Sequence, residues 1–417
     1  MKNKAIVSIV YKIKPLLVKL FPKSLLRYAK RKVLTETFKE MEQYKTLPYD
    51  KEQFSFGINL IGNIRANTGL GQSCRLVAEG LKQANIPFSI YLYNELNGAS
   101  TKEQEYDGRI RNELPYGINL IHINPHELGV AFHQLGENVW KHHYNIGFWL
   151  WELEEFPEEW VSCFNLFHEI WTPSEFISKA LRKKTKKPVK TIPYSVTVEK
   201  DVACDRAFFQ LPEDKFLYLM MYDSASVMER KNPMGVIEAF KKAFPIEDSS
   251  VGLVIKMKQY SKSEMQKIKE SLKGYQNIYF VEGDLLKSQV NALLSMVDVV
   301  VSLHRAEGFG LVMAEAMLLG TPVIATNWSA NTEFMNKNCA CMVDVTLIPL
   351  EKDYGPFKRG QRWAEPNITQ AAEYMKLLFQ DKQKYETFSK NGKEYVESKL
   401  SKEQVTIAII SALEGLQ

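Results

Sequence analysis

The segment from residue 297 to residue 326 constrains the fold most strongly, because it contains two strand patterns separated by one helix. VDVVVSL is short, apolar and β-branched, which is typical of a buried parallel strand, and PVIAT has the same character. Between them, the apolar residues of AEAMLLG lie at helical spacing, and Gly320 ends the helix. A strand, a glycine loop, a helix and a second strand form half of a nucleotide-binding α/β layer. The segment therefore predicts a parallel sheet with helices packed on it.

The loop of this unit carries candidate ligand-binding groups. Glycines allow a ligand close to the backbone, and the free amides at a helix start attract a phosphate or pyrophosphate. Glu307 stands directly before the glycines, and Glu315 follows about two helical turns later. A carboxylate accepts hydrogen bonds from adjacent sugar hydroxyls, so two acids beside one pyrophosphate predict a nucleotide-sugar site. The residues expected to contact this donor are Gly308, Phe309, Gly310, Leu311 and Glu315.

The stretch EGFGLVMAE, residues 307–315, resembles the E-x7-E signature of the retaining family-4 glycosyltransferases. The resemblance implies an α/β protein of the GT-B fold, with two Rossmann-like parallel-sheet domains facing a central cleft. Here a basic amphipathic helical segment would precede them. In the family, the first glutamate lies beside the donor sugar and the second beside the ribose. The resemblance covers about residues 54–417 and is most specific in the second half.

The chain is long enough, at 417 residues, for two α/β domains that each have a core. Its apolar content of 45% and charged content of 25% are ordinary for a globular protein. The five cysteines are scattered without paired metal-ligand spacing, so we expect reduced thiols and no metal site. The expected divisions are a basic N-terminal segment (1–50), an N-terminal acceptor domain (51–198), a C-terminal donor domain (199–398) and a last helix crossing back to the first domain (399–417).

The first 35 residues have an unusual distribution of charge. Ten lysines and arginines lie between residues 2 and 32, with no acid before Glu36, and apolar residues alternate with them at helical spacing broken at Pro15 and Pro22. Three interpretations remain open: a helix on a membrane surface, nucleic-acid binding, and a solvated helix covering the domain. The apolar residues favour an anionic membrane surface bound through residues 1–35, and no nucleic-acid motif is present. We therefore expect a cytoplasmic protein, peripheral on the inner face of the plasma membrane.

The first domain offers a second glycine loop. FSFGINLIG has the pattern of a strand, and Gly69 and Gly71 lie between it and the helix SCRLVAEGLKQAN. Backbone amides at such a strand-to-helix turn can face the phosphates of the donor or an acceptor. Arg75, in the first turn of the helix, is either an anion contact or a surface residue.

Three further residues of the first domain are candidates for substrate contacts. His122 and His126 fall at the carboxyl end of the strand pattern YGINLIHIN, where open α/β sheets bind ligands. Many relatives have a histidine near the donor sugar in the region of YNIGFWLWELEEF, but this chain has Trp151 and Glu152 there. A carboxylate among tryptophans is costly when buried without a partner, so Glu152 is the candidate catalytic residue of this segment.

The second domain supplies the cations. Arg230 and Lys231 are expected in the loop between a buried strand and the helix that starts at Pro233, where they can neutralise a diphosphate. Lys231 matches the lysine of the family, whereas the arginine position of the family is occupied by Ser226, so Arg230 is the replacement. Lys256 is a further phosphate candidate at a strand end, and Asn331, in the loop after PVIAT, is a candidate for the donor sugar. GQRWAEP (360–366) resembles an element of a subset of the family.

Together these residues predict transfer of a sugar from UDP or GDP to a hydroxyl of a glycan or polyprenyl-linked acceptor, as in bacterial surface-polysaccharide synthesis. Glu307, Arg230, Lys231 and Glu152 are the expected catalytic residues. The cations and loop amides carry the charge of the leaving group, so no metal or other cofactor is expected. Two alternatives are a GT-B epimerase, which would turn over donor without acceptor, and a non-catalytic nucleotide-sugar-binding scaffold, which would bind donor without turnover.

Overall fold

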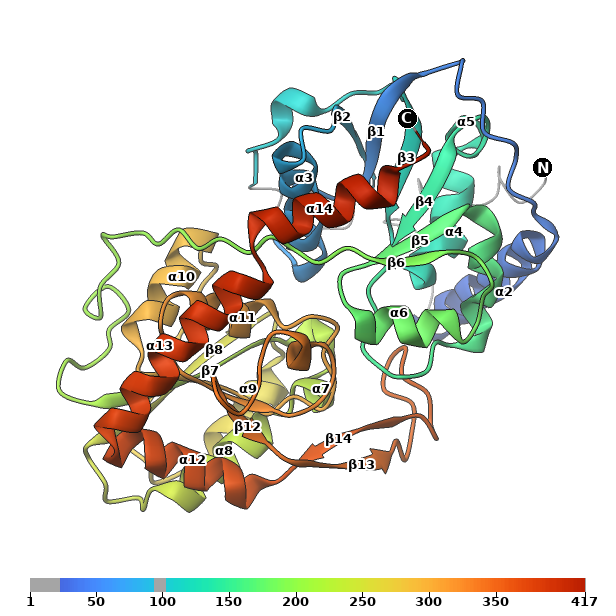
Figure 1. The fold of residues 1–417 in the computed structure, drawn as a ribbon. Coiled ribbons are helices and arrows are strands. Elements are labelled where there is room, and N and C mark those ends of the chain that lie inside the picture. The colour runs from blue at the N-terminus through green and yellow to red at the C-terminus, as the bar shows by residue number, and fades with distance from the viewer. Residues whose placement is uncertain (1–22, 94–102, 417) are drawn as a thin grey trace. The chain divides into compact units, whose positions relative to one another are not determined.

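The computed structural model describes residues 23–93 and 103–416, whose contacts divide them into two units. The first unit contains the described residues up to Trp151, Glu155–Ser195 and the residues from Lys402 onward. The second unit contains Glu152–Glu154 and Val196–Ser401. Each unit has its own six-stranded parallel sheet, so the predicted pair of Rossmann-like sheets is confirmed (Figure 1).

The sheet of the first unit has the strand order β2-β1-β3-β4-β5-β6. Its register is marked by a buried ladder in which Asn59 donates to Asn119 at 2.9 Å and Asn119 donates to Asn145 at 3.0 Å. These three residues are register partners on neighbouring strands, so a slip by one residue would leave buried amides without partners. The strands are β1 (Ser55–Gly62), β2 (Phe88–Leu92), β3 (Tyr116–His122), β4 (Tyr144–Phe148), β5 (Glu169–Thr172) and β6 (Val189–Thr191).

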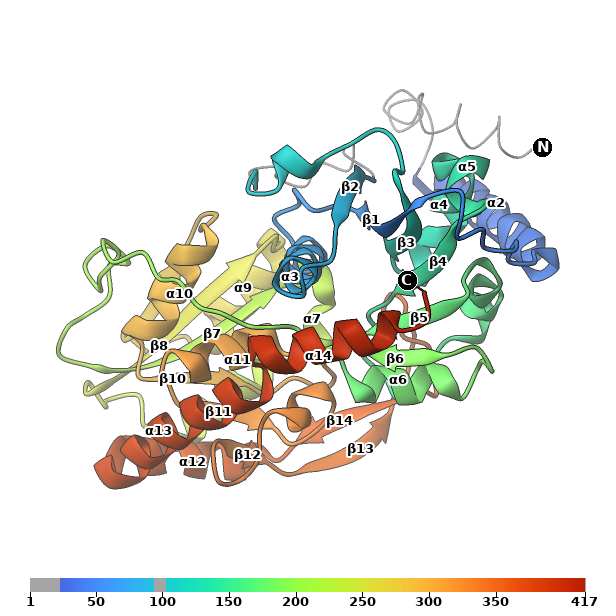
Figure 2. The ribbon, with the colours of Figure 1, turned by 45° about the horizontal axis from the view of Figure 1, so that its top comes forward.

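Helices cover this first sheet. The C-terminal helix α14 lies along α3, where the glycine at position 80 leaves room for Ile409 (Figure 1). Helices α2 and α4 lie side by side in both views (Figure 2). The helices are α2 (Lys23–Gln43), α3 (Gly69–Gln83), α4 (Pro125–Leu135), α5 (Glu137–Trp140), α6 (Glu175–Arg182) and α14 (Lys402–Leu413), with short 3-10 helices η1 (Asp107–Arg109) and η2 (Glu158–Leu166).

The basic N-terminal segment is described only from Lys23, so most of the predicted membrane-binding segment lies outside the described residues. The last turns of α2 pack on the first unit, because Thr37 and Met41 are buried and the carbonyl of Met41 accepts a hydrogen bond from Asn165 at 3.0 Å. Within the described residues, no helix is both long enough and apolar enough to cross a membrane.

The sheet of the second unit has the order β12-β11-β10-β7-β8-β9. Strands β8 and β9 are added on one side of β7, and β10, β11 and β12 are added on its other side. This is the strand order of dinucleotide-binding domains. The switch point between β7 and β10 is where such sheets bind ligands. The strands are β7 (Phe216–Asp223), β8 (Val251–Lys258), β9 (Ile278–Val281), β10 (Val299–Ser302), β11 (Val323–Thr326) and β12 (Cys341–Val343).

The glycine loop has the predicted local structure. Gly310 precedes α11 with φ +102°, and Gly320 follows its end with φ +81°, both in the region that favours glycine. An antiparallel hairpin, β13 (Val345–Pro349) and β14 (Arg362–Pro366), follows the sheet. The helices of the unit are α7 (Met228–Lys231), α8 (Pro233–Ala243), α9 (Lys262–Ser271), α10 (Lys287–Met296), α11 (Leu311–Leu318), α12 (Ile368–Gln380) and α13 (Lys382–Lys399), with 3-10 helices η3 (Ser224–Ser226) and η4 (Ala330–Glu333).

Candidate functional site

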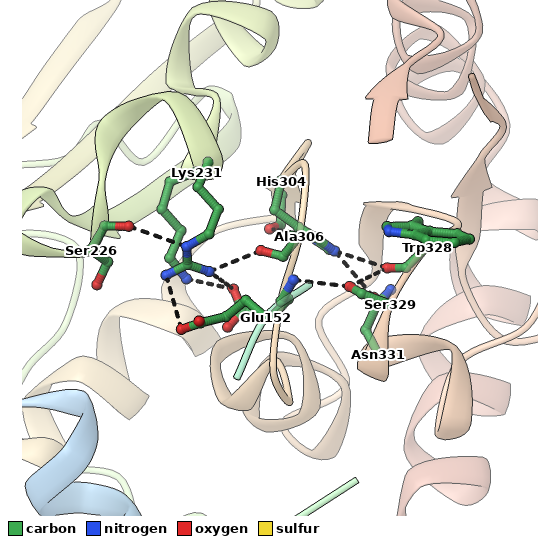
Figure 3. A network of polar contacts seen from close by, with 11 residues as sticks. Glu152, Ser226, Lys231, His304, Ala306, Trp328, Ser329 and Asn331 are labelled. Atoms are coloured by element: carbon green, nitrogen blue, oxygen red, sulfur yellow. Dashed lines mark hydrogen bonds and ion pairs between the residues drawn. The ribbon is translucent and has the colours of Figure 1, made fainter. Parts of the chain in front are cut away.

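Three connections at the carboxyl ends of neighbouring strands form a polar network in the second unit. The segment after β7 carries the short helix α7, the segment after β10 carries the glycine loop, and the segment after β11 carries residues 328–331. Figure 3 shows Ser226 and Lys231 on one side of Ala306, and Trp328, Ser329 and Asn331 on the other. The network therefore lies at the switch point of the sheet, where the strand order predicts a ligand.

Glu307 is the centre of the charged part of this network. The Nζ of Lys231 lies 2.5 Å from Oε2 of Glu307, and Nη1 of Arg230 lies 3.6 Å from the same oxygen. The Glu307 side chain is only 16% exposed. Burial raises the pKa of Glu307, but Lys231 and Arg230 outweigh it and lower that pKa to about 2. The carboxylate is thus fully ionised at neutral pH and held in one position.

The two cations lie on a short helix and not in the predicted loop. Helix α7 is bounded by two residues with positive φ, Val227 at 65° and Asn232 at 50°. A β-branched residue rarely adopts this conformation, at a cost of order 1–3 kcal/mol. The sequence interpretation was wrong here because Val227, from its type alone, gives no sign of the turn that starts the helix. The side chain of Asn232 then accepts a hydrogen bond from the amide at position 235 and caps α8.

Arg230 is buried and makes most of its hydrogen bonds to backbone carbonyls of the protein. Its side chain is 4% exposed, and it donates through Nε to the carbonyl of Ser226 at 3.2 Å and through Nη1 to the carbonyl of Ala306 at 2.9 Å. Its Nη2 lies 3.8 Å from Oε1 of Glu152. Arg230 therefore joins α7 to the glycine loop, and Lys231, which is more exposed, is the cation better placed for an anionic ligand.

Glu152, which the sequence offers as a candidate catalytic residue, lies beside this charged network, with its Oε1 3.8 Å from Nη2 of Arg230. Burial raises the pKa of Glu152, the Arg230 guanidinium opposes this, and the Glu307 carboxylate adds to it. The neighbouring tryptophans, Trp149 and Trp151, are buried, and Nε1 of Trp151 donates to the carbonyl of Glu155 at 2.9 Å. These two rings therefore belong to the core.

His304 is a member of the network that sequence analysis missed. It is buried, and its Nε2 lies 3.3 Å from the carbonyl of Trp328 and 3.1 Å from Oδ1 of Asn331. A carbonyl can only accept, so Nε2 carries the proton, and Nδ1 can accept from the hydroxyl of Ser302 at 3.0 Å. Burial lowers the pKa of His304, which keeps the ring neutral. The sequence signal that could have identified His304 is its position two residues after the end of the buried strand β10.

Asn331 and Ser329 hold the loop from the β11 side. Asn331 is buried and donates through Nδ2 to the carbonyl of Thr326 at 2.9 Å. The Oγ of Ser329 accepts from the amide of Glu307 at 3.0 Å, while Ser329 itself has φ +75°. The predicted donor contact Asn331 thus has several protein partners, and Ser329 fixes the backbone at Glu307.

Glu315 makes an ion pair with a residue that sequence analysis did not single out. Its Oε2 lies 2.5 Å from Nζ of Lys287, the first residue of α10, and its side chain is 3% exposed. Phe309, on the glycine loop, is buried with its ring centroid 5.4 Å from that of Phe334. The amides of Gly308, Phe309, Gly310 and Leu311, rather than this ring, are the groups of the loop suited to an anion.

Lys256 lies near the end of β8 and is buried. Its ammonium donates to the carbonyl of Gly283, and burial lowers the pKa of Lys256. The predicted phosphate candidate therefore holds the connection after β9, where the backbone at Gly283 has φ +85°.

Of the two glycines in the loop of the first unit, packing explains only Gly71. A Cβ on Gly71 would overlap the carbonyl oxygen of Ala66, whereas a Cβ on Gly69 would meet nothing within 4 Å. Arg75 is buried and donates to the carbonyls of Ile64 at 2.7 Å and Ala66 at 3.0 Å. The surface alternative for Arg75 was wrong, because this guanidinium satisfies backbone acceptors of the loop before α3.

The two candidate histidines of the first unit differ in environment. His122 is buried, its Nε2 lies 2.6 Å from Oγ of Ser73, and Ser73 lies 2.5 Å from the hydroxyl of Tyr194. Burial lowers the pKa of His122 to about 4. His126 lies in the first turn of α4 with its side chain 47% exposed.

A search for metal sites covered the described part of the chain. In residues 23–93 and 103–416, no group of three or more His, Cys, Asp or Glu side chains is arranged to hold a metal ion. All five cysteines are buried thiols.

Solved structures of known proteins share the fold of this chain. Solved structures with the same fold include Anabaena HepE in complex with UDP and glucose (13% identity, TM-score 0.62, 86% of this chain and 99% of that one). Sucrose-phosphate synthase from Thermosynechococcus elongatus has 16% identity and a TM-score of 0.62 over 87% of this chain and 99% of that one. A variant of S. aureus TarM, solved with UDP, has 16% identity and a TM-score of 0.53 over 72% of this chain and 55% of that one.

Among curated protein sequences, no significant relative was found. The sequence model of the family described as "Glycosyl transferases group 1" matches residues 204–344, which contain Arg230, Lys231, Glu307 and Glu315. Residues 204–344 are therefore similar to the group 1 glycosyl transferases, and the solved structures above share the predicted two-sheet GT-B fold.

Proposed function

We propose that this chain transfers a sugar from a uridine diphosphate donor to a hydroxyl of a glycan or lipid-linked acceptor, with retention of the anomeric configuration. The observation that carries the proposal is the contact of Lys231 with Glu307 at the switch point of the second sheet. One group attracts a diphosphate and the other accepts hydrogen bonds from sugar hydroxyls. Uridine is favoured because the similar folds HepE and TarM were solved with UDP.

The proposed reaction separates charge. The bond between C1 of the sugar and the diphosphate oxygen breaks, the bond from C1 to the acceptor oxygen forms, and the hydroxyl proton leaves to the diphosphate or to water. Negative charge grows on the leaving group, and Lys231 together with the loop amides from Gly308 to Leu311 stabilises it. Glu307 positions the sugar, Arg230 fixes the backbone at Ala306, and Glu315 is assigned to the ribose. Glu152 is assigned to the acceptor or to the sugar, as the further acid of the network.

The donor class is tested by thermal unfolding with UDP, GDP and TDP at equal concentrations. A ligand that binds only the folded state stabilises it by about 2.7 kcal/mol at 100 times its Kd. UDP is therefore expected to raise Tm by several degrees and GDP by much less. A larger shift with GDP would contradict the uridine assignment, and no shift with any nucleotide would contradict the donor site itself.

We further propose that the basic N-terminus places the enzyme on an anionic membrane surface, which suits a polyprenyl-linked acceptor on the cytoplasmic side. Support comes from the charge and apolar pattern of residues 2–32, since each basic residue near such a surface contributes about 1 kcal/mol. The last turns of α2, which follow this segment in the chain, pack on the first unit through Met41.

The membrane proposal is tested by sedimentation with vesicles of phosphatidylglycerol and of phosphatidylcholine. Replacing Lys12, Lys14 and Lys19 by glutamate is expected to lower binding to the anionic vesicles by more than tenfold, with little binding to neutral vesicles in either case. The matched control replaces three lysines of α13 by glutamate, namely Lys384, Lys390 and Lys393. Equal losses in both triple variants, or none in the first, would contradict a role for the N-terminus.

A further inference from the structure

The hairpin β13–β14 begins directly after the segment that matches the family model. Its connecting loop is ordered by its own contacts. The backbone of Leu350 bonds to Gln361 at 2.7 Å, and the rings of Tyr354 and Trp363 lie 5.0 Å apart. Phe357 on the loop is buried. The hairpin and its loop therefore form an ordered element that is packed within the second unit.

One residue of the glycine loop is held by the hairpin through both its side chain and its backbone. Arg305 donates to the two carboxylate oxygens of Glu365, from Nε at 2.7 Å and from Nη2 at 3.0 Å. The amide of Ala364 donates to the carbonyl of Arg305 at 2.9 Å. The guanidinium also lies 5.3 Å from the ring centre of Trp363. A two-pronged pair with a backbone bond beside it fixes both the distance and the orientation of the loop.

Arg305 also contacts the helix that carries the cations. Its amide donates to the carbonyl of Arg230 at 2.7 Å, and its Nη1 donates to the carbonyl of Glu229 at 2.9 Å. One residue thus joins the hairpin, α7 and the glycine loop. It stands two positions before Glu307, so a displacement of Arg305 moves the acid relative to Lys231.

The hairpin reaches the other acid of the network as well. Nη2 of Arg362 lies 2.7 Å from Oε1 of Glu154, two residues after Glu152, and Glu152–Glu154 belongs to the same unit. The guanidinium carbon of Arg230 lies 5.9 Å from the ring centre of Phe357. Contacts from one hairpin therefore extend to the segments of Glu152, Arg230 and Glu307.

We propose that the hairpin β13–β14 is a positioning element of the donor site, in which Glu365 acts through Arg305 and Arg362 acts through Glu154. Glu365 and Arg362 touch no substrate in this assignment; they set the geometry of the acids and cations. The inference rests on the proposed sugar transfer for its kinetic part, since a reacting group misplaced by about 1 Å can cost 100-fold in rate. Its structural part, the fixing of residues 304–307, stands independently of the reaction.

The test compares Glu365→Gln, Glu365→Asp and Arg362→Ala in the full chain with Glu351→Gln, an exposed carboxylate on the loop of the same hairpin. For each variant we measure Tm, the Kd for UDP, and kcat and KM with a UDP-sugar. We also measure amide hydrogen exchange of the peptide that contains residues 304–307.

We expect Glu365→Gln to lower kcat at least tenfold with the Kd for UDP changed less than threefold, and Glu365→Asp to recover part of the loss. Amide exchange at Arg305 and Glu307 should become faster. Arg362→Ala should lower kcat less, and Glu351→Gln should change nothing.

Two results would overturn the positioning role. The first is wild-type kcat in Glu365→Gln, whatever its Tm, and the second is unchanged exchange at residues 304–307 in the same variant. A lower Tm with full turnover of the folded fraction would make the hairpin a purely stabilising element. Where wild type transfers no sugar, the proposed function fails, and hydrogen exchange alone then decides whether the hairpin fixes the loop.

Discussion

Glu307→Gln is expected to lower kcat by at least about 100-fold while the protein remains folded. The amide keeps the size of the side chain but carries no charge, so it loses the ion pair with Lys231 and weakens the acceptor for sugar hydroxyls. Steady-state kinetics with a UDP-sugar, together with circular dichroism, measure the effect. The matched control is Glu229→Gln, an exposed acid on α7, which should retain wild-type kcat.

A Glu307→Gln enzyme with kcat within threefold of wild type would remove Glu307 from the mechanism. Loss of the native circular-dichroism spectrum would assign the residue to folding instead, so both measurements are made on the same sample. The more conservative Glu307→Asp should retain intermediate activity, because the charge remains but its reach is shortened.

Lys231→Met is expected to weaken UDP binding at least tenfold and to lower kcat by about 100-fold or more, because the ammonium serves both the bound diphosphate and the charge that grows on it. Methionine keeps the length of the side chain. Lys241→Met, an exposed lysine of α8, is the control. Wild-type affinity for UDP in Lys231→Met would place the diphosphate elsewhere.

The same variant changes the pH dependence in a definite direction. In the wild type the pKa of Glu307 is lowered to about 2, chiefly by Lys231 against the effect of burial. Its ionisation therefore contributes stability that is complete above the unfolded pKa of about 4.3 and is lost as pH falls toward 2. Without Lys231 the folded pKa rises toward or above the unfolded one, so this contribution shrinks. The stability gap between wild type and Lys231→Met should narrow as pH falls from 5 to 3 in urea titrations.

The fold could be predicted because its signals are local. The run VVVS forms a buried strand, and glycines at positions 310 and 320 bound the helix as their conformations require. The position of Glu307 beside Lys231 could also be anticipated, because both follow strands that are neighbours at the switch point. In these cases a few adjacent residues determine the local structure, and the strand order brings their ends together.

The missed features depend on partners far apart in the sequence. Glu315 pairs with Lys287, and Arg305 pairs with Glu365, and nothing in the residues around either acid identifies its partner. Arg230 was expected to contact phosphate but donates to the backbone carbonyls of Ser226 and Ala306. Such ion pairs and turns follow from the assembled unit, so sequence patterns alone could not assign them.

The central claim is that Lys231 binds the diphosphate while Glu307 serves the sugar, and titration calorimetry with UDP alone tests it most directly. UDP lacks the sugar, so the account predicts at least tenfold weaker binding for Lys231→Met. Glu307→Gln should bind UDP as tightly as wild type or more tightly, since it releases the ammonium from its partner. Weaker binding in Glu307→Gln together with unchanged binding in Lys231→Met would contradict the account.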